Sequence, residues 1–486
     1  LLTDVLRDQW GFKGFVYSDL TSIEGIVGAR VAKDNKEAAV LALKAGLDMD
    51  LGGNAYGKNL QKALEEGAIT MDDLNRAVAN VLRLKFRMGL FENPYVSPEQ
   101  AKQVVRSKAH KELAREVARE GIVLLKNEGV LPLKKNIGSI AVIGPNADMM
   151  YNQLGDYTAP QEREEIVTVL DGIRKAVSPS TKVNYVKGCA IRDITTSNIT
   201  AAVEAARAAD AVVLVVGGSS ARDFKTKYIG TGAADVSNDG NQLLSDMDCG
   251  EGYDRSTLRL LGDQEKLLEA VAATGKPLVV IYIQGRTLNM NLASEKAQAL
   301  LTAWYPGEQG GAAIADVLFG DYNPAGRLPV SVPRSEGQLP LFYSQGKQRA
   351  YVEEEGTPLY AFGYGLSYTK FDYSQLELQK GNGKDVLQTV SCTVTNTGDC
   401  DGEEVVQLYI CDKVASVSQS PILLKAFERI SLKKGESKKV TFTLGEEELS
   451  LYNMEMKQVV EPGDFKVMVG ASSEDIRLND RFTVVE

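Results

Sequence analysis

Apolar and polar positions in the first 95 residues follow a pattern that predicts two successive strand–helix units. The short apolar segments GFKGFVYSD (11–19) and LDMDLGG (47–53) have the length and flanking turn residues of buried strands. Stretches with helical spacing precede and follow them. Helices are expected over 1–10, 36–46, 57–66 and 71–88, with Thr70 capping the last and Gly89 ending it. This alternation is typical of a parallel sheet or barrel.

Residues 1–95 are too few to close such a barrel by themselves. A (β/α)8 barrel takes about 250 residues, so we interpret 1–95 as the last two βα units of a truncated TIM-like barrel. Two prolines in NPYVSP (93–98) break the helical pattern. We expect 96–120 to be a linker and a charged helix to run over 107–127.

From residue 121 onward the pattern changes to near-continuous apolar strands separated by helices. Strands of this kind are typical of a parallel sheet that is covered on both faces. We therefore expect an α/β sandwich domain over 121–335. Its strands are expected at 139–147, 182–188, 211–218, 277–283 and 299–306, and its helices at 166–177, 197–209, 263–274 and 309–319.

The last third of the chain has a third pattern. Residues 336–370 form an aromatic, proline-punctuated connector with few regular signals. Over 371–486, short alternating segments such as KKVTFTL (438–444) are separated by turn residues. This spacing predicts an all-β sandwich of the immunoglobulin or fibronectin type III kind. The predicted fold class is thus α/β, with part of a barrel and an α/β sandwich, followed by a β-sandwich.

Composition narrows the chemistry. A net charge of -10 over 486 residues argues against sequence-independent nucleic-acid binding and against docking on an anionic membrane. No apolar run approaches the about 20 residues of a membrane span. The five cysteines include no C-x-x-C pair, so a structural zinc site is not expected. Because the chain begins at Leu1, we expect its natural N-terminus and any export signal to lie upstream.

Histidine chemistry is nearly excluded as well. The single histidine, His110, lies in a charged stretch that is typical of a solvated helix. Acid/base chemistry must therefore come from carboxylates, tyrosine or lysine.

Carboxylates at strand ends are the first candidates. Asp19 follows the first predicted strand, and in β/α barrels the catalytic groups lie where a strand meets its loop. Asp48 and Asp50 occupy the end of the second strand and are equally good candidates on position alone. The alternative for all three is a structural role as a helix cap or turn former.

A second set of carboxylates lies in the loop DMDCGEGYDR (246–255). Repulsion among buried carboxylates raises the pKa of at least one of them, as a general acid near neutral pH requires. The alternatives are a solvated acidic turn or a divalent-ion loop, although the spacing does not fit an EF-hand. The charged residues concerned are Asp246, Asp248, Glu251, Asp254 and Arg255.

Aromatic residues near these loops are candidate platforms for a sugar ring. They are Tyr17, Tyr253, Trp304 and Tyr305. Trp304 and Tyr305 end an apolar strand, so a place in the core is the more typical role for them.

Several blocks of the sequence occur together in an informative order. They are WGFKGFVYSDL (10–20), KAGLDMDLG (44–52), REGIVLLKNEGVLPLKK (119–135), CGEGYDRSTLRLL (249–261), WYPGEQGGAAIADVLFGDYNPAGRLPVSVP (304–333) and FGYGLSYTKFDYS (362–374). These blocks resemble glycoside hydrolase family three: the end of its barrel, its second domain and its fibronectin-like third domain. The resemblance covers essentially the whole chain.

The resemblance implies a retaining double displacement. The family's nucleophile, the Asp of the Ser-Asp pair at the end of a late barrel strand, falls on Asp19. The acid/base, the Glu of an E-G-x-D-R-like loop, falls on Glu251. Retention requires their carboxyl groups to lie about 5–5.5 Å apart. No metal and no organic cofactor are implied.

Two departures from the family pattern affect the sugar site. Many members have Trp after the nucleophile where this chain has Leu20. We expect Leu20 and, on the other loop, Tyr253 to contact the substrate. The early barrel strands that hold the glycone in the family are not in this sequence. We therefore expect weak or no activity from these 486 residues alone.

The implied function is that of an exo-β-glycosidase that removes terminal β-D-glucosyl residues from β-glycosides or oligosaccharides. A β-xylosidase of the same family is the first alternative, and a non-catalytic carbohydrate-binding remnant is the second. A metal-dependent hydrolase is a further option that a chelator test separates. The resemblance implies a periplasmic or extracellular location and leaves the oligomeric state open.

Overall fold

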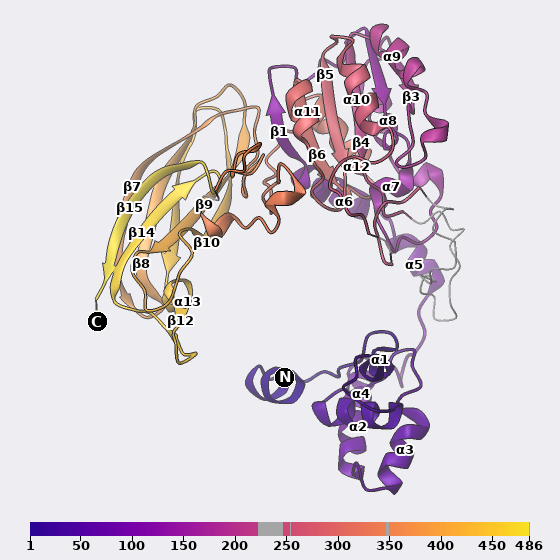
Figure 1. Ribbon diagram of the computed structural model, residues 1–486, viewed down its shortest axis with the longest axis vertical. Helices are drawn as coiled ribbons and strands as arrows, with labels where there is room; N and C mark the ends of the chain where they lie inside the picture. Colours follow the sequence, from indigo (N-terminus) through magenta and orange to yellow (C-terminus); the bar gives the residue numbers. More distant parts are fainter. Residues whose placement is uncertain (222–245, 253, 347–348, 486) are drawn as a thin grey trace. The chain divides into compact units, whose positions relative to one another are not determined.

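The computed structural model of the chain describes residues 1–221, 246–252, 254–346 and 349–485 (Figure 1). It divides into two compact units, one formed by Leu1–Ser107 and one that begins at Lys108. The second unit contains an α/β domain and a β-sandwich. Within the described ranges, no helix combines the length and the apolar character that a membrane span requires.

The first unit is mainly helical. It begins with a helical segment of π type, and helices α1–α4 follow. Their bounds are Leu2–Gln9, Ser22–Gly28 (α1), Asn35–Ala45 (α2), Gly57–Glu65 (α3) and Met71–Arg87 (α4). The helices predicted over 36–46, 57–66 and 71–88 are confirmed. Thr70 caps α4 through reciprocal hydrogen bonds with Asp73, and Gly89 follows the helix with a φ of 66°.

The two strands predicted in this unit are reduced to one bridge. Segments 11–19 and 47–53 meet at a single parallel pair, Tyr17 and Met49. The prediction of two full strands is therefore wrong. A parallel strand is stable when strands bond it on both sides and helices cover its faces, and in the described chain each segment pairs only with the other. The barrel itself stays a prediction.

The α/β domain is built on a six-stranded sheet in the order β1-β6-β5-β4-β2-β3 (Figure 1). All neighbours are parallel except β1, which runs antiparallel to β6. The five strands predicted for this domain are confirmed. The bounds are Val123–Asn127 (β1), Ser139–Ile143 (β2), Lys182–Val186 (β3), Ala211–Gly217 (β4), Leu278–Ile283 (β5) and Ala299–Trp304 (β6).

Strand β1 corrects one prediction. The helix expected over 107–127 ends at residue 121 as α6 (Lys108–Gly121), and α5 (Pro98–Val104) precedes it. The next residues, Ile122 to Leu125, are all at most 1% exposed. Four consecutive buried side chains cannot share one face of a surface helix, whereas a strand between two helical layers buries both faces.

Helices cover both faces of the sheet. One apolar core joins the sheet to α6, α8 (Val169–Ala176) and α12 (Gly310–Leu318). The opposite core joins it to α9 (Ile199–Arg207), α10 (Gln264–Ala272) and α11 (Asn291–Lys296). Alternate residues of one strand serve the two cores, as Val142 and Ala141 do in β2. The predicted α/β sandwich is confirmed.

The C-terminal domain is a sandwich of two antiparallel sheets. One has the order β10-β9-β14-β15 and the other β11-β8-β7. Their inner faces share one apolar core, which confirms the predicted all-β sandwich. The bounds are Phe371–Gly383 (β7), Val386–Asn396 (β8), Gly402–Asp412 (β9), Leu423–Leu432 (β10), Ser437–Leu444 (β11), Gly463–Gly470 (β14) and Ile476–Val484 (β15).

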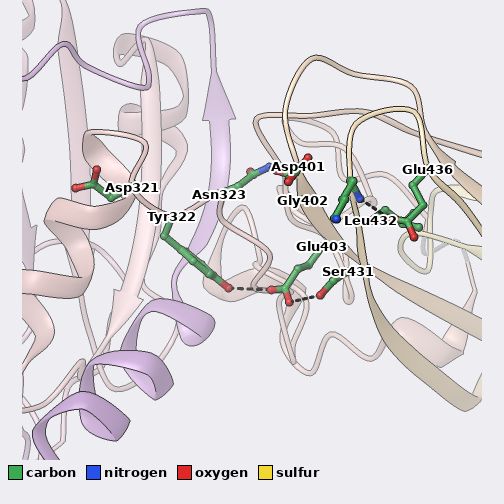
Figure 2. Close-up of a pocket in the computed structure, with 10 residues that line it drawn as sticks. Asp321, Tyr322, Asn323, Asp401, Gly402, Glu403, Ser431, Leu432 and Glu436 are labelled. Carbon is green, nitrogen blue, oxygen red and sulfur yellow. Dashed lines mark hydrogen bonds between the residues drawn. The ribbon is translucent and has the colours of Figure 1, made fainter.

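Polar side chains join the α/β domain to the sandwich. A pocket of about 410 Å³ lies at this junction. There the hydroxyl of Tyr322 donates to Glu403 (3.1 Å), as drawn in Figure 2. Glu403 also accepts from Ser431 (2.8 Å). Deeper in the junction, Arg327 donates to Glu404 (2.7 Å), and both side chains are less than 10% exposed.

Candidate active site

Asp19 lies on a tight turn directly after the bridge of the first unit. The turn is fixed by the buried Ser18, whose Oγ accepts from the Leu51 N–H (2.9 Å). Asp19 is exposed, and its Oδ1 accepts from the backbone N–H of Leu20 (2.7 Å). The Leu20 side chain is half-buried. This arrangement presents a carboxylate to solvent from a backbone that its neighbours hold in place.

The other two strand-end carboxylates have structural partners. The side chain of Asp48 is fully buried and accepts from Arg7 (2.5 Å), from the Val16 N–H (2.9 Å) and from Asn80 (3.1 Å). Asp50 accepts from backbone N–H groups of the turn before α3. Of the three equal candidates from sequence, only Asp19 is therefore left with the exposure that a nucleophile needs.

The carboxylates of the acidic loop in the second unit accept hydrogen bonds from different parts of the α/β domain. Asp246 accepts from the backbone N–H groups of Ile191 and Arg192, each at 2.8 Å. Asp248 is buried and accepts from the Ser219 N–H (2.7 Å) and from Arg255 (2.5 Å). These two carboxylates anchor the N-terminal part of the loop to the α/β domain.

Asp254 is an acid of this loop whose pKa repulsion does not raise, while the raised pKa expected for a buried carboxylate stays a prediction. Its carboxylate accepts from the Arg255 N–H (2.8 Å) and from Arg286 (2.7 Å). These donors lower the pKa of Asp254 below its ordinary value, with the Arg255 N–H as the largest cause. Repulsion does not raise this pKa because cations and N–H groups are interleaved with the acids.

Glu251 lies at the exposed tip of the same loop. Its backbone N–H donates to Asp156 (3.0 Å), and its carboxylate accepts from the Tyr157 hydroxyl. The candidate Tyr253 lies outside the described residues. Sequence reasoning missed Asp156 and Tyr157, since only their place after a parallel strand marks them.

The loops that meet around Glu251 follow parallel strands of one sheet. The segment with Asp156 follows β2, and the Glu251 loop follows β4. Arg286 follows β5, and Tyr305 follows β6. In open α/β sheets, ligands bind beyond the carboxyl ends of the strands where the strand order reverses, which here is between β2 and β4.

The remaining aromatic candidates have mixed roles. Tyr305 is half-buried, and its hydroxyl lies 3.6 Å from the Cys249 Sγ. Trp304 packs against one core of the sheet. Tyr17 is 56% exposed, so it is accessible beside Asp19. His110 is exposed on α6, as expected for a solvated helix.

The two proposed catalytic carboxylates come from different units, Asp19 from the first and Glu251 from the second. The distance of about 5–5.5 Å that retention requires stays a prediction. Among the described residues, no three His, Cys, Asp or Glu side chains are grouped as metal ligands.

Three family models match the chain in order. They are the glycosyl hydrolase family 3 N-terminal domain over residues 1–84, the family 3 C-terminal domain over 122–368, and a fibronectin type III-like domain over 404–473. The last two matches fall on the α/β domain and the β-sandwich.

Relatives named as glycosidases match nearly all of the chain. It is 40% identical to a periplasmic beta-glucosidase of Salmonella typhimurium, over 98% of this chain and 64% of that protein. It is also 40% identical to a beta-xylosidase of Formosa agariphila, over 98% of this chain and 65% of that protein. The chain thus spans slightly less than two thirds of these relatives.

Solved structures agree with these matches. A β-glucosidase from Erythrobacter marinus has a TM-score of 0.88 and 37% identity, over 100% of this chain and 65% of that one. A beta-glucosidase from Listeria innocua in complex with glucose has a TM-score of 0.86 and 32% identity, over 99% of this chain and 64% of that one. The chain belongs to glycosyl hydrolase family 3.

Proposed function

We propose that this protein acts in the hydrolysis of terminal β-D-glucosyl residues with retention of configuration, with Asp19 as nucleophile and Glu251 as acid/base. The observation that carries the proposal is the contrast between Glu251 and its acidic neighbours. Asp246 and Asp248 accept hydrogen bonds that anchor the loop, whereas Glu251 lies at the exposed tip of the loop. A proton donor to a glycosidic oxygen needs this accessibility.

The chemistry follows the two carboxylates. Asp19 attacks the anomeric carbon and forms a covalent ester with the sugar, while Glu251 transfers its proton to the leaving glycosidic oxygen. Glu251, now a carboxylate, then removes a proton from water. The water oxygen attacks the anomeric carbon and releases Asp19. Two inversions at this carbon give net retention. Leu20 and Tyr253 are proposed to contact the sugar.

The nucleophile is tested by trapping. A 2-deoxy-2-fluoro-β-glucoside with a good leaving group slows the second step more than the first, so the ester accumulates. Mass spectrometry of the complete gene product should place the added sugar on the peptide containing Asp19, and the Asp19→Asn variant should not be labelled. Asp8→Asn, a change at an exposed aspartate in the same unit, is the matched control. A label elsewhere contradicts the assignment.

The acid/base is tested with leaving groups of different pKa. Glu251→Ala should lower kcat/KM by about 10²–10⁴-fold for a poor leaving group such as an alkyl alcohol. The loss should be much smaller for dinitrophenolate, which leaves without protonation. Azide should restore turnover by attacking the glycosyl-enzyme without a base and yield the β-glycosyl azide. Glu455→Ala, at an exposed glutamate of the β-sandwich, should behave as the unchanged protein.

A β-xylosidase is the second candidate because the chain is equally similar, at 40% identity, to relatives of both names. The two substrates differ by the hydroxymethyl group at C5. The ratio of kcat/KM for aryl β-glucoside and aryl β-xyloside separates them. No turnover of either substrate by the complete gene product would favour a non-catalytic carbohydrate-binding role.

We propose a periplasmic or extracellular location, which is supported by the similarity to the periplasmic beta-glucosidase of Salmonella typhimurium. Fractionation of cells that express the complete gene, with the activity assayed in each fraction, tests it. We propose a neutral glycoside as the substrate, and we propose neither a nucleic-acid partner nor insertion into a membrane.

A further inference from the structure

We infer that Asp156 and Tyr157 are positioning residues for Glu251, one through its backbone and the other through its carboxylate. The inference rests on the proposed function, since it assigns a task to residues that act through the acid/base. Both residues belong to the turn that follows α7 (Met150–Leu154), in the crossover between β2 and β3.

Asp156 joins two backbone segments with one carboxylate. Its Oδ1 accepts from the N–H of Tyr157 (2.9 Å), and its Oδ2 accepts from the N–H of Glu251 (3.0 Å). The two bonds fix the position of each segment relative to the other. Charged acceptors form hydrogen bonds about twice as strong as neutral ones, so this link between the loops is a firm one.

The contact depends on a glycine in the Glu251 loop. A Cβ on Gly250 would lie 2.8 Å from the Asp156 Oδ2, and the residue has a φ of 139°. Only glycine accepts both this backbone conformation and this approach at low cost. The loop backbone is thus shaped to receive the Asp156 carboxylate immediately before Glu251.

The turn that carries Asp156 is held from its other side by Tyr305. A Cβ on Gly155 would lie 3.0 Å from the Tyr305 ring, and one on Gly285 would lie 2.5 Å from it. The hydroxyl of the same tyrosine reaches the Cys249 Sγ (3.6 Å). One ring therefore supports both the turn and the loop.

Tyr157 acts on the carboxylate itself. It has a φ of 58°, which is uncommon for a residue with a side chain, and its hydroxyl donates to the Glu251 Oε2. When Glu251 has given its proton to the leaving oxygen, the hydroxyl stabilises the resulting carboxylate. Tyr157 keeps its own proton throughout, and Glu251 regains one from water in the second step.

The other charged groups near Glu251 are engaged with each other among the described residues. Asp248 pairs with Arg255, and Asp254 pairs with Arg286. Asp156 presents its carboxylate to backbone N–H groups, and the Cys249 thiol has a pKa raised chiefly by burial. Tyr157 is a described side chain that donates to the Glu251 carboxylate, so its removal should act on Glu251.

The test is the pH dependence of kcat/KM for the complete gene product. Its alkaline limb reports deprotonation of the general acid in the free enzyme. Tyr157→Phe removes a donor that favours the carboxylate, so the alkaline limb should move to higher pH. Because Tyr157 is 71% exposed and water replaces part of the bond, we expect a shift of about half to one pH unit. The acidic limb should stay in place.

Asp156 should show a different signature. Asp156→Ala frees the loop backbone, so kcat/KM should fall by about three- to tenfold for a poor leaving group and hardly change for dinitrophenolate. Asp156→Asn keeps an oxygen acceptor and should recover part of the loss. Tyr452→Phe, at an exposed tyrosine of the β-sandwich, is the control. Circular dichroism of every variant checks that it folds.

The outcomes separate this inference from the function on which it rests. If Glu251→Ala keeps its activity on poor leaving groups, the acid/base assignment itself fails. If Glu251 is essential, but Tyr157→Phe leaves the alkaline limb in place and Asp156→Ala loses activity equally for all leaving groups, the positioning role is refuted.

Discussion

The ion pair between Asp248 and Arg255 closes the loop that carries Glu251. We expect Arg255→Ala to lower kcat/KM strongly and to lower the global free energy of unfolding only in part. The two side chains are 1% and 3% exposed and lie 2.5 Å apart. The same guanidinium donates from Nε to the Thr257 carbonyl (2.7 Å) and from Nη2 to the Arg259 carbonyl. Burial lowers the pKa of Arg255, and Asp248 opposes this effect.

The magnitude follows from what the truncation leaves behind. Removing one partner of a buried ion pair costs about 3–5 kcal/mol, because the other charge stays buried without compensation. Asp248 would keep its bond from the Ser219 N–H but lose the guanidinium. The loop can escape this penalty by opening to solvent, so the loss of global stability is limited to the free energy of local opening. A loop that opens no longer holds Glu251, and activity should fall about 10²-fold or more for poor leaving groups.

The assay combines three measurements on the complete gene product. Urea unfolding gives the change in global stability, and kcat/KM for poor and good leaving groups gives the change in acid catalysis. Hydrogen exchange of peptides covering 246–252 detects local opening. Arg255→Lys keeps the charge without the planar fork and should recover only part of the activity. Arg481→Ala, at an exposed arginine of β15, is the control.

Two results would refute this reasoning. One is unchanged exchange in 246–252 together with unchanged kcat/KM in Arg255→Ala, which would show that the ion pair does not order the loop. The other is a full 3–5 kcal/mol loss of global stability with activity retained at low temperature. That result would place the pair in the global core and not in the loop.

Three further predictions concern stability, each measured by urea unfolding. Arg327→Ala should cost about 3–5 kcal/mol by leaving the buried Glu404 without its partner, and the double variant Arg327→Met/Glu404→Leu should recover most of this loss; a double variant as unstable as the single one contradicts the argument. Thr70→Ala should cost about 1 kcal/mol through the lost cap of α4, whereas an unchanged midpoint would mean that the cap carries no weight. Burial alone would raise the pKa of Glu403, but bonds from Arg429 and Ser431 bring it below its ordinary 4.5. Its contribution should therefore be complete above that pH and vanish as the pH falls through the lowered pKa, so Glu403→Gln and the unchanged protein should differ at pH 7 and converge in acid.

The α/β domain and the β-sandwich could be predicted from sequence because each strand reports its own environment. In β4 every residue from Ala211 to Gly217 is buried, and a continuous apolar run announces a strand covered on both faces. In β11 buried and exposed residues alternate, and this alternation indicates a strand with one face exposed to solvent. These are local signals, so no knowledge of the partner strands was needed.

The errors arose where a partner decides the structure. Residues 123–127 form a strand because they pair with β6, far along the chain, while helical spacing in the preceding residues favoured a longer helix. Segments 11–19 and 47–53 have the composition of strands but only one bridge between them. Their pattern indicates a preference for the extended conformation, but a strand forms only where neighbouring strands supply hydrogen bonds.

For the candidate site, the sequence led to proposed catalytic residues but not to the residues that contact them. Asp19 and Glu251 were assigned from the resemblance of their motifs to the family, and their catalytic roles stay predictions. Asp156 and Tyr157 have no such motif, and their relation to Glu251 depends on β2 and β4 being neighbours in the sheet. That neighbourhood is a property of the strand order, which periodicity along the chain does not contain.

The acidic loop illustrates why the number of carboxylates in a segment says little about their titration. Asp246, Asp248 and Asp254 each have N–H or guanidinium donors within 2.5–2.8 Å, and the donors to Asp254 lower its pKa. Asp246, Asp248 and Asp254 therefore hold the loop to the rest of the α/β domain, and Glu251 lies exposed at the tip of that loop. It follows that substitutions in the turn after α7, which supplies Asp156, should also affect acid catalysis, although less than Arg255→Ala within the loop itself.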